Sequence, residues 1–426
     1  MDRPLVTIHC TVYNHAKYLR DALEGFVSQK TDFKYNIFVY DDASTDGSSD
    51  ILREYAAKYP GIFDICISPV NTFGKQCRNR QMLMLESKYL TGKYVAICEG
   101  DDYWTDENKL QMQVDYLESH PDATMCVHAS IWEDLFTGSQ KNFILYDKDC
   151  DIPAEEIIAP VKRIPRTASF VIRRELYDEP RFGDFPKADC WDLPILMYAS
   201  MFGKIHYINR EMSVYRCGTE NSWSKKTVGS NRGLIKNTFI IFKYLEECYK
   251  KYGKYKDAYI ERLNRKLIYS AWHERNLSYE EWEDAVKSVS AELGNVSPVF
   301  VDKLRTVHHI YCDGTGLDDD EMEMLKQCDH ILIFGTGDYA EGALTIIRKN
   351  ALNGKFAGYL VSKKNAELFN DKPIWPVSDY PMDKEKTGVI VGVGSVLRKE
   401  VGTLLEELSY RYVAPFWKNF WGDNLN

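Results

Sequence analysis

Short apolar runs that end in polar turns, with helical patterns between them, most limit how this chain can fold. The runs of strand length in the first hundred residues are 5–11, 35–40, 62–67 and 94–98. Amphipathic helical patterns begin at residue 17 and cover residues 50–58 and 109–118. Strands that alternate with helices of this length predict an α/β fold with a mainly parallel sheet and right-handed crossovers.

Carboxylates gather directly after the fourth run, in Glu99-Gly100-Asp101-Asp102-Tyr103-Trp104. In open α/β sheets, ligands bind outside the carboxyl ends of the strands. Adjacent carboxylates repel each other unless a cation lies between them. Mg²⁺ and Mn²⁺ prefer oxygen ligands and often join a carboxylate to a substrate phosphate. The run is therefore a candidate metal–diphosphate site, and the alternative is an acidic turn that caps a helix. We expect Asp102 to lie in a turn and not in a core.

An ordered set of motifs carries a resemblance to a known family. The motifs are Thr11-Val12-Tyr13-Asn14, Val39-Tyr40-Asp41-Asp42-Ala43-Ser44-Thr45-Asp46-Gly47-Ser48, Gly92-Lys93-Tyr94-Val95, the acidic run, Thr167-Ala168-Ser169-Phe170-Val171-Ile172-Arg173-Arg174 and Met212-Ser213-Val214-Tyr215-Arg216. Over about its first half, the chain resembles the family 2 glycosyltransferases, inverting enzymes with the GT-A fold. Each motif alone is weak, whereas the ordered set is specific. Glu99 departs from the family pattern, which usually has Asp there.

The resemblance implies a metal-dependent transfer of a sugar from a nucleotide-diphospho-sugar, with a UDP-sugar as the first expectation. The acceptor would be a hydroxyl of a glycan, a lipid-linked or a protein-linked molecule in bacterial surface glycan synthesis. Asp102 with Asp101 would hold Mn²⁺ or Mg²⁺. Asp192 would take the acceptor proton, and Asp189 is the rival general base. Asp192 also has a structural alternative, because a carboxylate at a helix start caps the helix and meets its positive dipole end.

The resemblance also implies a nucleotide pocket. The residues expected there are Thr11, Tyr13, Asn14, Asp42, Lys75, Arg78 and Asp101. Asp42 would hydrogen-bond the base, and Tyr13 would offer an aromatic face for stacking. Lys75 or Arg78 would reach the phosphates.

Relatives often carry a histidine after the last matching strand, where it helps to hold the metal or the diphosphate. This chain has Tyr215-Arg216-Cys217-Gly218 there and no histidine. The sequence therefore names no third metal ligand. Arg216, Lys225 or Lys226 could neutralise the diphosphate instead.

Length and charge limit the remaining possibilities. A chain of 426 residues can hold two or three domains with full cores. We expect a catalytic domain over 1–228, a helical region over 229–328 and a Rossmann-like domain over 329–426. The formal net charge of −9 argues against nonspecific nucleic-acid binding, which depends on basic residues that contact phosphates.

The cysteines indicate a reducing compartment. Eleven cysteines are spread singly without a Cys-x-x-Cys pair, so we expect reduced thiols and neither a disulfide frame nor a zinc site. The start of the chain has no basic-plus-apolar leader, and no apolar run approaches the roughly twenty residues that span a bilayer. We expect a cytoplasmic protein that reaches a lipid-linked acceptor peripherally, at the inner face of the membrane.

Composition and pattern suggest the structure of two further segments. Residues 132–151 are polar and irregular, and we interpret them as a surface loop. Residues 230–328 show helical patterns, with a capping box at Ser278-Tyr279-Glu280-Glu281.

The last hundred residues form a second α/β pattern. A strand over 330–334 leads into Gly335-Thr336-Gly337-Asp338-Tyr339-Ala340, the Gly-x-Gly-x-x-Ala form of a Rossmann turn, and further strands are expected over 357–361 and 388–391. A NAD site would want an acid after the second strand, where this chain has Ser362-Lys363-Lys364. The region weakly resembles the nucleotide-sugar-binding domain of bacterial sugar acyltransferases. The alternative is that the glycines serve only tight strand–helix packing.

We expect this region to be an accessory domain that pairs subunits or grips acceptor and membrane. The aromatic tail at 416–421 would be either an interaction site or core.

Two rival functions come from other classes. A sugar-nucleotide nucleotidyltransferase should have a Gly-x-Gly-x-Arg loop after the first strand, and this chain has Thr-Val-Tyr-Asn there. An NAD(P)-binding oxidoreductase would use the glycine turn at 335–340. Cofactor binding distinguishes this second rival.

Overall fold

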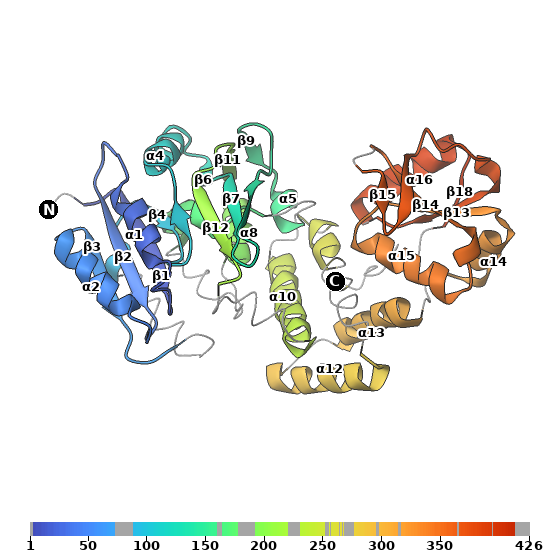
Figure 1. Cartoon of the computed structure of the whole chain (residues 1–426), viewed down its shortest axis with the longest axis horizontal. Helices are drawn as coiled ribbons and strands as arrows, with labels where there is room; N and C mark the ends of the chain where they lie inside the picture. The colour runs from blue at the N-terminus through green and yellow to red at the C-terminus, as the bar shows by residue number, and fades with distance from the viewer. Residues whose placement is uncertain are drawn as a thin grey trace. The chain divides into compact units, whose positions relative to one another are not determined.

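Figure 1 shows the computed structural model of the chain. It describes residues 3–72, 88–159, 164–177, 192–219, 231–251, 255, 257–263, 265, 267, 277–294, 298–313, 317–363, 366–393 and 395–413. The chain divides into two compact units, Met1–Thr227 and Val228–Asn426. The expected helical region and the expected C-terminal α/β region fall together in the second unit.

An eight-stranded sheet is the centre of the first unit. Its strands are β1 (Val6–Val12), β2 (Tyr35–Asp41), β3 (Phe63–Ile67), β4 (Tyr94–Ile97), β6 (Ala123–His128), β9 (Cys150–Ile152), β10 (Val171–Arg173) and β11 (Lys204–Ile208), in the order β3-β2-β1-β4-β10-β6-β11-β9. β1 pairs in parallel with β2 and β4, while β10 and β9 are antiparallel to their neighbours. The predicted α/β class with a mainly parallel sheet is confirmed.

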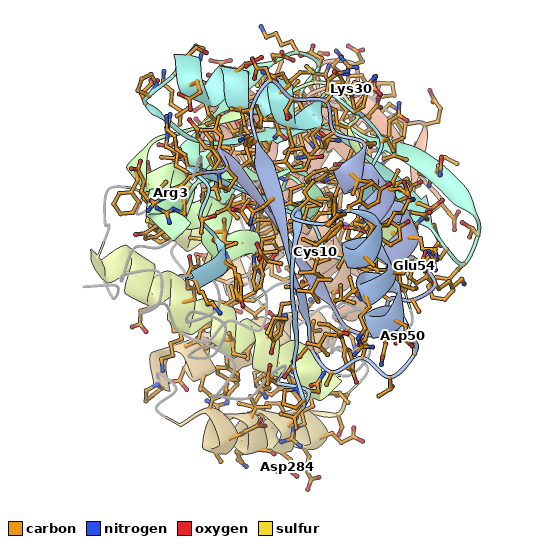
Figure 2. All side chains as sticks on the ribbon, turned by 90° about the vertical axis from the view of Figure 1, so that its left-hand side faces the viewer. Arg3, Cys10, Lys30, Asp50, Glu54 and Asp284 are labelled. Carbon is orange, nitrogen blue, oxygen red and sulfur yellow. The ribbon has the colours of Figure 1, made fainter. Side chains whose placement is uncertain are left out.

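Helices cover this sheet with their apolar faces. Among the described residues, the helices of the first unit are α1 (Leu19–Val27), α2 (Ser48–Lys58), α4 (Lys109–Ser119), α5 (Ala154–Ile158), α6 (Arg174–Tyr177) and α8 (Asp192–Phe202). Leu23 and Phe26 of α1 are fully buried in one apolar cluster with Ile8 and Cys10 of β1. Figure 1 shows α1 and α2 beside β1–β3. In Figure 2, Cys10 lies on the inner strand and Glu54 on α2, where its side chain is half-exposed and pairs with Arg20.

The interpretation of residues 132–151 as a loop is wrong. β7 (Ser130–Asp134) and β8 (Ser139–Phe143) form an antiparallel hairpin. With β5 (Tyr103–Trp104) and β12 (Ser213–Cys217), they make a second sheet in the order β5-β12-β7-β8. β8 is an edge strand whose first four residues are exposed. Its polar composition therefore concealed a strand that backbone pairing to β7 holds in place.

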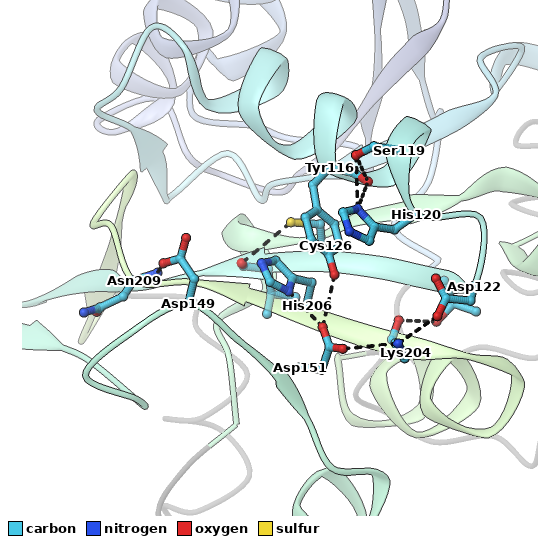
Figure 3. Close-up of polar contacts among 12 residues, drawn as sticks. Tyr116, Ser119, His120, Asp122, Cys126, Asp149, Asp151, Lys204, His206 and Asn209 are labelled. Atoms are coloured by element: carbon cyan, nitrogen blue, oxygen red, sulfur yellow. Dashed lines mark hydrogen bonds and ion pairs between the residues drawn. The ribbon is translucent and has the colours of Figure 1, made fainter.

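A cluster of paired polar groups joins β9, an edge strand of the eight-stranded sheet, to α4 and β11 (Figure 3). The Tyr116 ring stacks between His120 and His206, with centroid distances of 4.0 and 3.6 Å. The Tyr116 hydroxyl and His206 Nδ1 both donate to Asp151 Oδ1, at 3.1 and 2.9 Å. Lys204 lies 3.6 Å from the other oxygen of Asp151. We call these five residues the Tyr116 cluster.

The second unit begins with helices and ends in a sheet. Its helices include α10 (Asn231–Lys251), α12 (Tyr279–Leu293), α13 (Pro298–Asp313) and α14 (Asp319–Gln327). The predicted capping box is confirmed, because Ser278 and Glu281 exchange side-chain and backbone hydrogen bonds at the start of α12.

The sheet of the second unit has β13 (His330–Phe334) inside it. The other strands are β14 (Phe356–Val361), β15 (Leu368–Phe369), β16 (Lys372–Pro376), β17 (Thr387–Val391) and β18 (Arg411–Val413), in the order β15-β16-β14-β13-β17-β18. The helices α15 (Asp338–Lys349) and α16 (Ser395–Glu407) follow β13 and β17. The strands expected at 330–334, 357–361 and 388–391 are present. Lys364 and the tail at 416–421 lie outside the described residues.

Packing accounts for one glycine of the turn after β13. Gly335 has a φ of +112°, and a Cβ there would lie 2.6 Å from the carbonyl oxygen of Gly392. A larger residue would therefore push apart the turns that follow β13 and β17. This geometry favours the packing alternative for Gly335.

The expectations about membrane-spanning segments and cysteines can be compared with the described residues. Within them, the structure contains no helix with the length and apolar character needed to cross a bilayer. The cysteines described as free thiols are Cys10, Cys66, Cys98, Cys126, Cys150, Cys217 and Cys328.

Candidate functional site

The acidic run follows β4 at the edge of the sheet where β1 and β2 also end. Backbone hydrogen bonds continue past the strand ends: Gly100 donates to Thr11 O at 3.0 Å, and Asp42 donates to Val12 O at 2.9 Å. The register pairs Val12 with Asp41 and His9 with Ile97. The structure thus brings together three motifs that are separated in the sequence.

The surroundings of Glu99 and Asp102 disfavour the ionised forms of their carboxyl groups. Loss of solvation and the charges of Asp101 and Asp192 raise the pKa of Glu99 to about 8. Burial and the charges of Asp101 and Glu99 raise the pKa of Asp102 well above its usual value. A hydrogen bond from the Arg216 backbone and the charge of Arg166 act in the opposite direction. These carboxyl groups therefore resist ionising together, and a bound cation would favour their ionised forms.

The two adjacent aspartates differ in exposure. Asp102 is only 3% exposed, and its Oδ1 accepts the Arg216 N–H at 2.8 Å. The expectation that Asp102 lies outside a core is wrong, because β12 passes over the turn and presents an N–H that needs a partner. The Asp101 side chain is 17% exposed, and its Oδ2 accepts from Thr219 Oγ1 at 3.0 Å. Asp101 is thus the aspartate with carboxylate surface open to a ligand.

Arg216 does not have the role that the sequence suggested. Its guanidinium forms an ion pair with Asp21, donates to Glu133 at 3.1 Å and donates to the carbonyl oxygen of Asp101 at 3.2 Å. It also lies over the Tyr103 ring, and only 9% of its side chain is exposed. A guanidinium saturated in this way joins β12 to its neighbours and is not available to a diphosphate.

The expected pocket residues at the ends of β1 and β2 are partly occupied by loop contacts. Asp42 Oδ1 accepts the backbone N–H and the hydroxyl of Thr72, both at 2.8 Å. Asn14 has a φ of +57°, and its side chain accepts the Thr45 N–H at 2.8 Å. Tyr13 and Thr11 are partly exposed. These contacts hold together the loops that follow β1, β2 and β3.

Asp192 is the first residue of α8, as expected. Its Oδ1 accepts the N–H of Leu193 at 2.8 Å, so the carboxylate satisfies one backbone donor of the first helical turn. Its charge also contributes to the raised pKa of Glu99, which shows that Asp192 lies within electrostatic range of the acidic run. The remaining candidates, Asp189, Lys75, Arg78, Lys225 and Lys226, lie outside the described residues.

Sequence reasoning missed two groups at this site. His15 Nε2 lies 3.9 Å from Asp101 Oδ2, and the position of His15 directly after Asn14 could have drawn attention to it. The Arg166 guanidinium lies between 4.4 and 4.8 Å from the ring centres of Trp132, Phe143 and Tyr215. Two of these rings belong to the hairpin that the sequence analysis took for a loop.

The residues present fit a divalent cation in one specific way. Among the described residues, no group of three or more His, Cys, Asp or Glu side chains is arranged to hold a metal. Mg²⁺ needs no such cage, because it is usually bound through one or two carboxylates plus substrate phosphates. Asp101 and Asp102 are adjacent carboxyl groups of this kind, and a cation would favour the ionised form of Asp102, which burial and its neighbours disfavour.

Comparisons with known proteins find similarity over part of the chain. Residues 7–179 match the family model described as glycosyl transferase family 2. An uncharacterised protein of Mycobacterium tuberculosis is 35% identical over 217 residues, which cover 50% of this chain and 58% of that protein. The chain therefore spans little more than half the length of this relative.

Two further matches are weaker. A dTDP-rhamnosyl transferase of Shigella flexneri is 31% identical over 105 residues, which cover 25% of this chain and 35% of that protein. The crystal structure of residues 1–349 of TarS from S. aureus, in complex with UDP-GlcNAc, covers 74% of this chain and 93% of that one. Its identity of 14% and TM-score of 0.43 are too low to support an argument from geometry.

Proposed function

We propose that this chain is a glycosyltransferase, from the premise that residues 7–179 belong to glycosyl transferase family 2. The donor would be a nucleotide-diphospho-sugar, with a UDP-sugar as the first candidate. The acceptor would be a hydroxyl of a glycan, a lipid-linked or a protein-linked molecule. The observation that carries the proposal is the run of carboxyl groups with raised pKa values at the sheet edge, next to the loops of Asn14 and Asp42.

The proposed reaction is a single displacement with inversion. The acceptor oxygen forms a bond to the anomeric carbon while the bond from that carbon to the diphosphate breaks. The electron pair of the broken bond stays on the diphosphate, and the acceptor proton passes to the general base. Asp192 is the candidate base, because it adds its charge to the acidic run and lies at a fixed helix start. Asp189 remains its rival.

Asp101 and Asp102 are the proposed metal residues. When bound, Mn²⁺ or Mg²⁺ supplies Lewis-acid neutralisation of the leaving diphosphate. Asp101 would be the main ligand, because its carboxylate is the more exposed of the two. Asp102 would add negative charge from beneath, while its Oδ1 keeps the Arg216 N–H.

Asp42, Thr11, Tyr13 and Asn14 are the proposed nucleotide residues, with Lys75 and Arg78 for the phosphates. The domain assignment is also a proposal: 1–228 catalytic, 229–328 helical and 329–426 accessory. Pairing of subunits or a grip on acceptor and membrane remains the proposed role of the accessory domain.

A panel of nucleotide sugars tests the proposal. Thermal unfolding of the full chain with Mn²⁺ should identify a donor that stabilises the protein, and product analysis with that donor should detect sugar transfer or hydrolysis. Asp101→Asn should abolish turnover without loss of the fold. Asp122→Asn is a matched control, because this exposed aspartate pairs with Lys204 away from the site. Near wild-type turnover of Asp101→Asn, in EDTA-treated buffer supplemented with Mn²⁺, would contradict the metal assignment.

A further inference from the structure

His15 is held firmly at the end of β1, next to the acidic run. Its backbone N–H donates to Ser48 Oγ at 3.0 Å, and the following Ala16 N–H donates to Asp46 at 2.9 Å. These bonds attach the turn after β1 to the start of α2. Only 15% of the His15 side chain is exposed. The ring therefore has a defined position that no role described so far explains.

The two ring nitrogen atoms of His15 have different surroundings. Nδ1 is buried and has no hydrogen-bond partner among the described residues. It faces the backbone of Gly100, where a Cβ would lie only 3.0 Å from it. Nε2 faces Asp101 Oδ2 at 3.9 Å, which is too long for a hydrogen bond. Glycine at position 100 thus makes room for the ring and leaves Nε2 facing the carboxylate.

This geometry selects one tautomer of the neutral ring. A neutral imidazole carries its proton on one nitrogen and accepts on the other. A proton on Nδ1 would be a buried donor without an acceptor, which costs the desolvation of that group. An unprotonated Nδ1 also lacks a partner, so Asp101 decides between the tautomers: a proton on Nε2 turns the positive end of the N–H toward that carboxylate and is favoured. The N–H then lies on the side of the ring that faces Asp101, and with Nε2 3.9 Å from Oδ2 it is too far from that carboxylate to bond it.

We propose that His15 Nε2–H donates a hydrogen bond to the diphosphate of the nucleotide donor and, after transfer, to the nucleoside diphosphate product. The inference rests on the proposed function, which brings a diphosphate to Asp101. A donor that is fixed before the reaction stabilises the charge that develops on the leaving group. His15 would thus supply a group for the diphosphate from the turn after β1, in a chain without the histidine expected after β12.

Two amide variants test which nitrogen matters. The amide nitrogen of Gln lies near the place of Nε2, whereas that of Asn lies near the place of Nδ1. In isothermal titration with Mn²⁺ present, His15→Asn should bind UDP, dTDP or GDP, whichever the wild type binds, about 10- to 100-fold more weakly, as expected for loss of a hydrogen bond to a charged group. His15→Gln should bind close to wild type. The matching nucleoside, which lacks phosphates, should bind all three proteins equally.

His206→Gln is the matched control. This histidine is also mostly buried in the same unit, but it belongs to the Tyr116 cluster. It should leave nucleotide binding unchanged. Thermal unfolding of each variant checks that the fold is kept.

The contrary outcomes are distinct. If the wild type binds none of the three diphosphates, the proposed function and this inference both fail. If His15→Asn binds as tightly as wild type, the inference alone fails. Equal weakening in the Asn and Gln variants would overturn the assignment to Nε2. Weaker binding of Mn²⁺ alone in both variants, measured by electron paramagnetic resonance, would overturn it in favour of a metal ligand.

Discussion

The first unit contains two His–Asp pairs, His206–Asp151 and His15–Asp101. The two pairs differ in whether their polar atoms find partners inside the protein. His206 donates to Asp151 at 2.9 Å and stacks on Tyr116 at 3.6 Å. His15 lies 3.9 Å from Asp101, and its Nδ1 has no partner among the described residues. The first pair has its interactions inside the protein. The second pair lacks a direct hydrogen bond between its two members, and both side chains keep some exposed surface.

The carboxyl groups show the same contrast. Burial would raise the pKa of Asp151, but hydrogen bonds from His206 and Tyr116 outweigh it and hold this pKa below its usual value. In the acidic run, burial and neighbouring carboxylates raise the pKa of Asp102 and Glu99. Hydrogen bonds in the Tyr116 cluster favour ionised Asp151 and stabilise the fold at neutral pH. The ionised acidic run destabilises the fold unless a cation or substrate is bound. The predictions below test this contrast, from the largest expected effect to the smallest.

Asp192→Asn should have the largest effect on turnover. Loss of a general base lowers kcat by about 10²–10⁴-fold, while donor affinity should stay near wild type. The matched change in the paired cluster, Asp151→Asn, should lower stability and leave kcat unchanged. Steady-state kinetics with the donor found in the panel measures both. A normal kcat for Asp192→Asn would move the base to Asp189 or elsewhere.

Glu99→Gln should change how stability depends on pH. The ordinary pKa of Glu99 is 4.5, and in the folded protein it is about 8. Between these values the folded state keeps a proton that the unfolded chain has released, so stability should fall as pH rises from about 5 to about 8. Glu99→Gln should flatten this slope.

Urea unfolding at several pH values, in EDTA, measures the effect of Glu99. Asp151→Asn provides the contrast, because its lowered pKa gives stability that is present above its ordinary value of 3.8 and is lost as pH falls further. Equal slopes for wild type and Glu99→Gln between about pH 5 and 8 would contradict the assignment.

Mn²⁺ should stabilise the folded protein through the acidic run and not through the Tyr116 cluster. At ten times its dissociation constant, a ligand of the folded state adds about 1.4 kcal/mol to the free energy of unfolding. This gain should disappear in Asp101→Asn and remain in Asp151→Asn. Thermal unfolding across a Mn²⁺ titration measures it. An unchanged gain in Asp101→Asn would show that the cation binds elsewhere.

His206→Gln should have the smallest effect. It removes a stacked ring pair, worth about 0.5–1.5 kcal/mol of stability, while an amide can still donate a hydrogen bond. Chemical unfolding should show this loss at neutral pH. A change in turnover would mean that the Tyr116 cluster is not purely structural.

Local patterns predicted the strands and the turns after them. The runs at 35–40 and 94–98 became β2 and β4 because each is an apolar segment of strand length that ends in residues favouring turns. The parallel order then placed Asn14, Asp42 and the acidic run at one sheet edge, as alternation of strands and helices requires. The position of Asp192 at a helix start was also visible, since a carboxylate before an apolar face is a capping pattern.

The sequence by itself thus determined the α/β class and the gathering of carboxylates, since both depend on residues close together in the chain. Only the tertiary structure decided which of these groups are paired. Asp102 is buried because β12 passes over it, and Arg216 is occupied because Asp21 and Glu133 come from distant elements. The hairpin β7–β8 was hidden because an edge strand is held by backbone pairing and can be polar. A polar side chain can bind a ligand only through the hydrogen bonds and charge that its neighbours in the protein leave unsatisfied. The tertiary structure decides which neighbours it has.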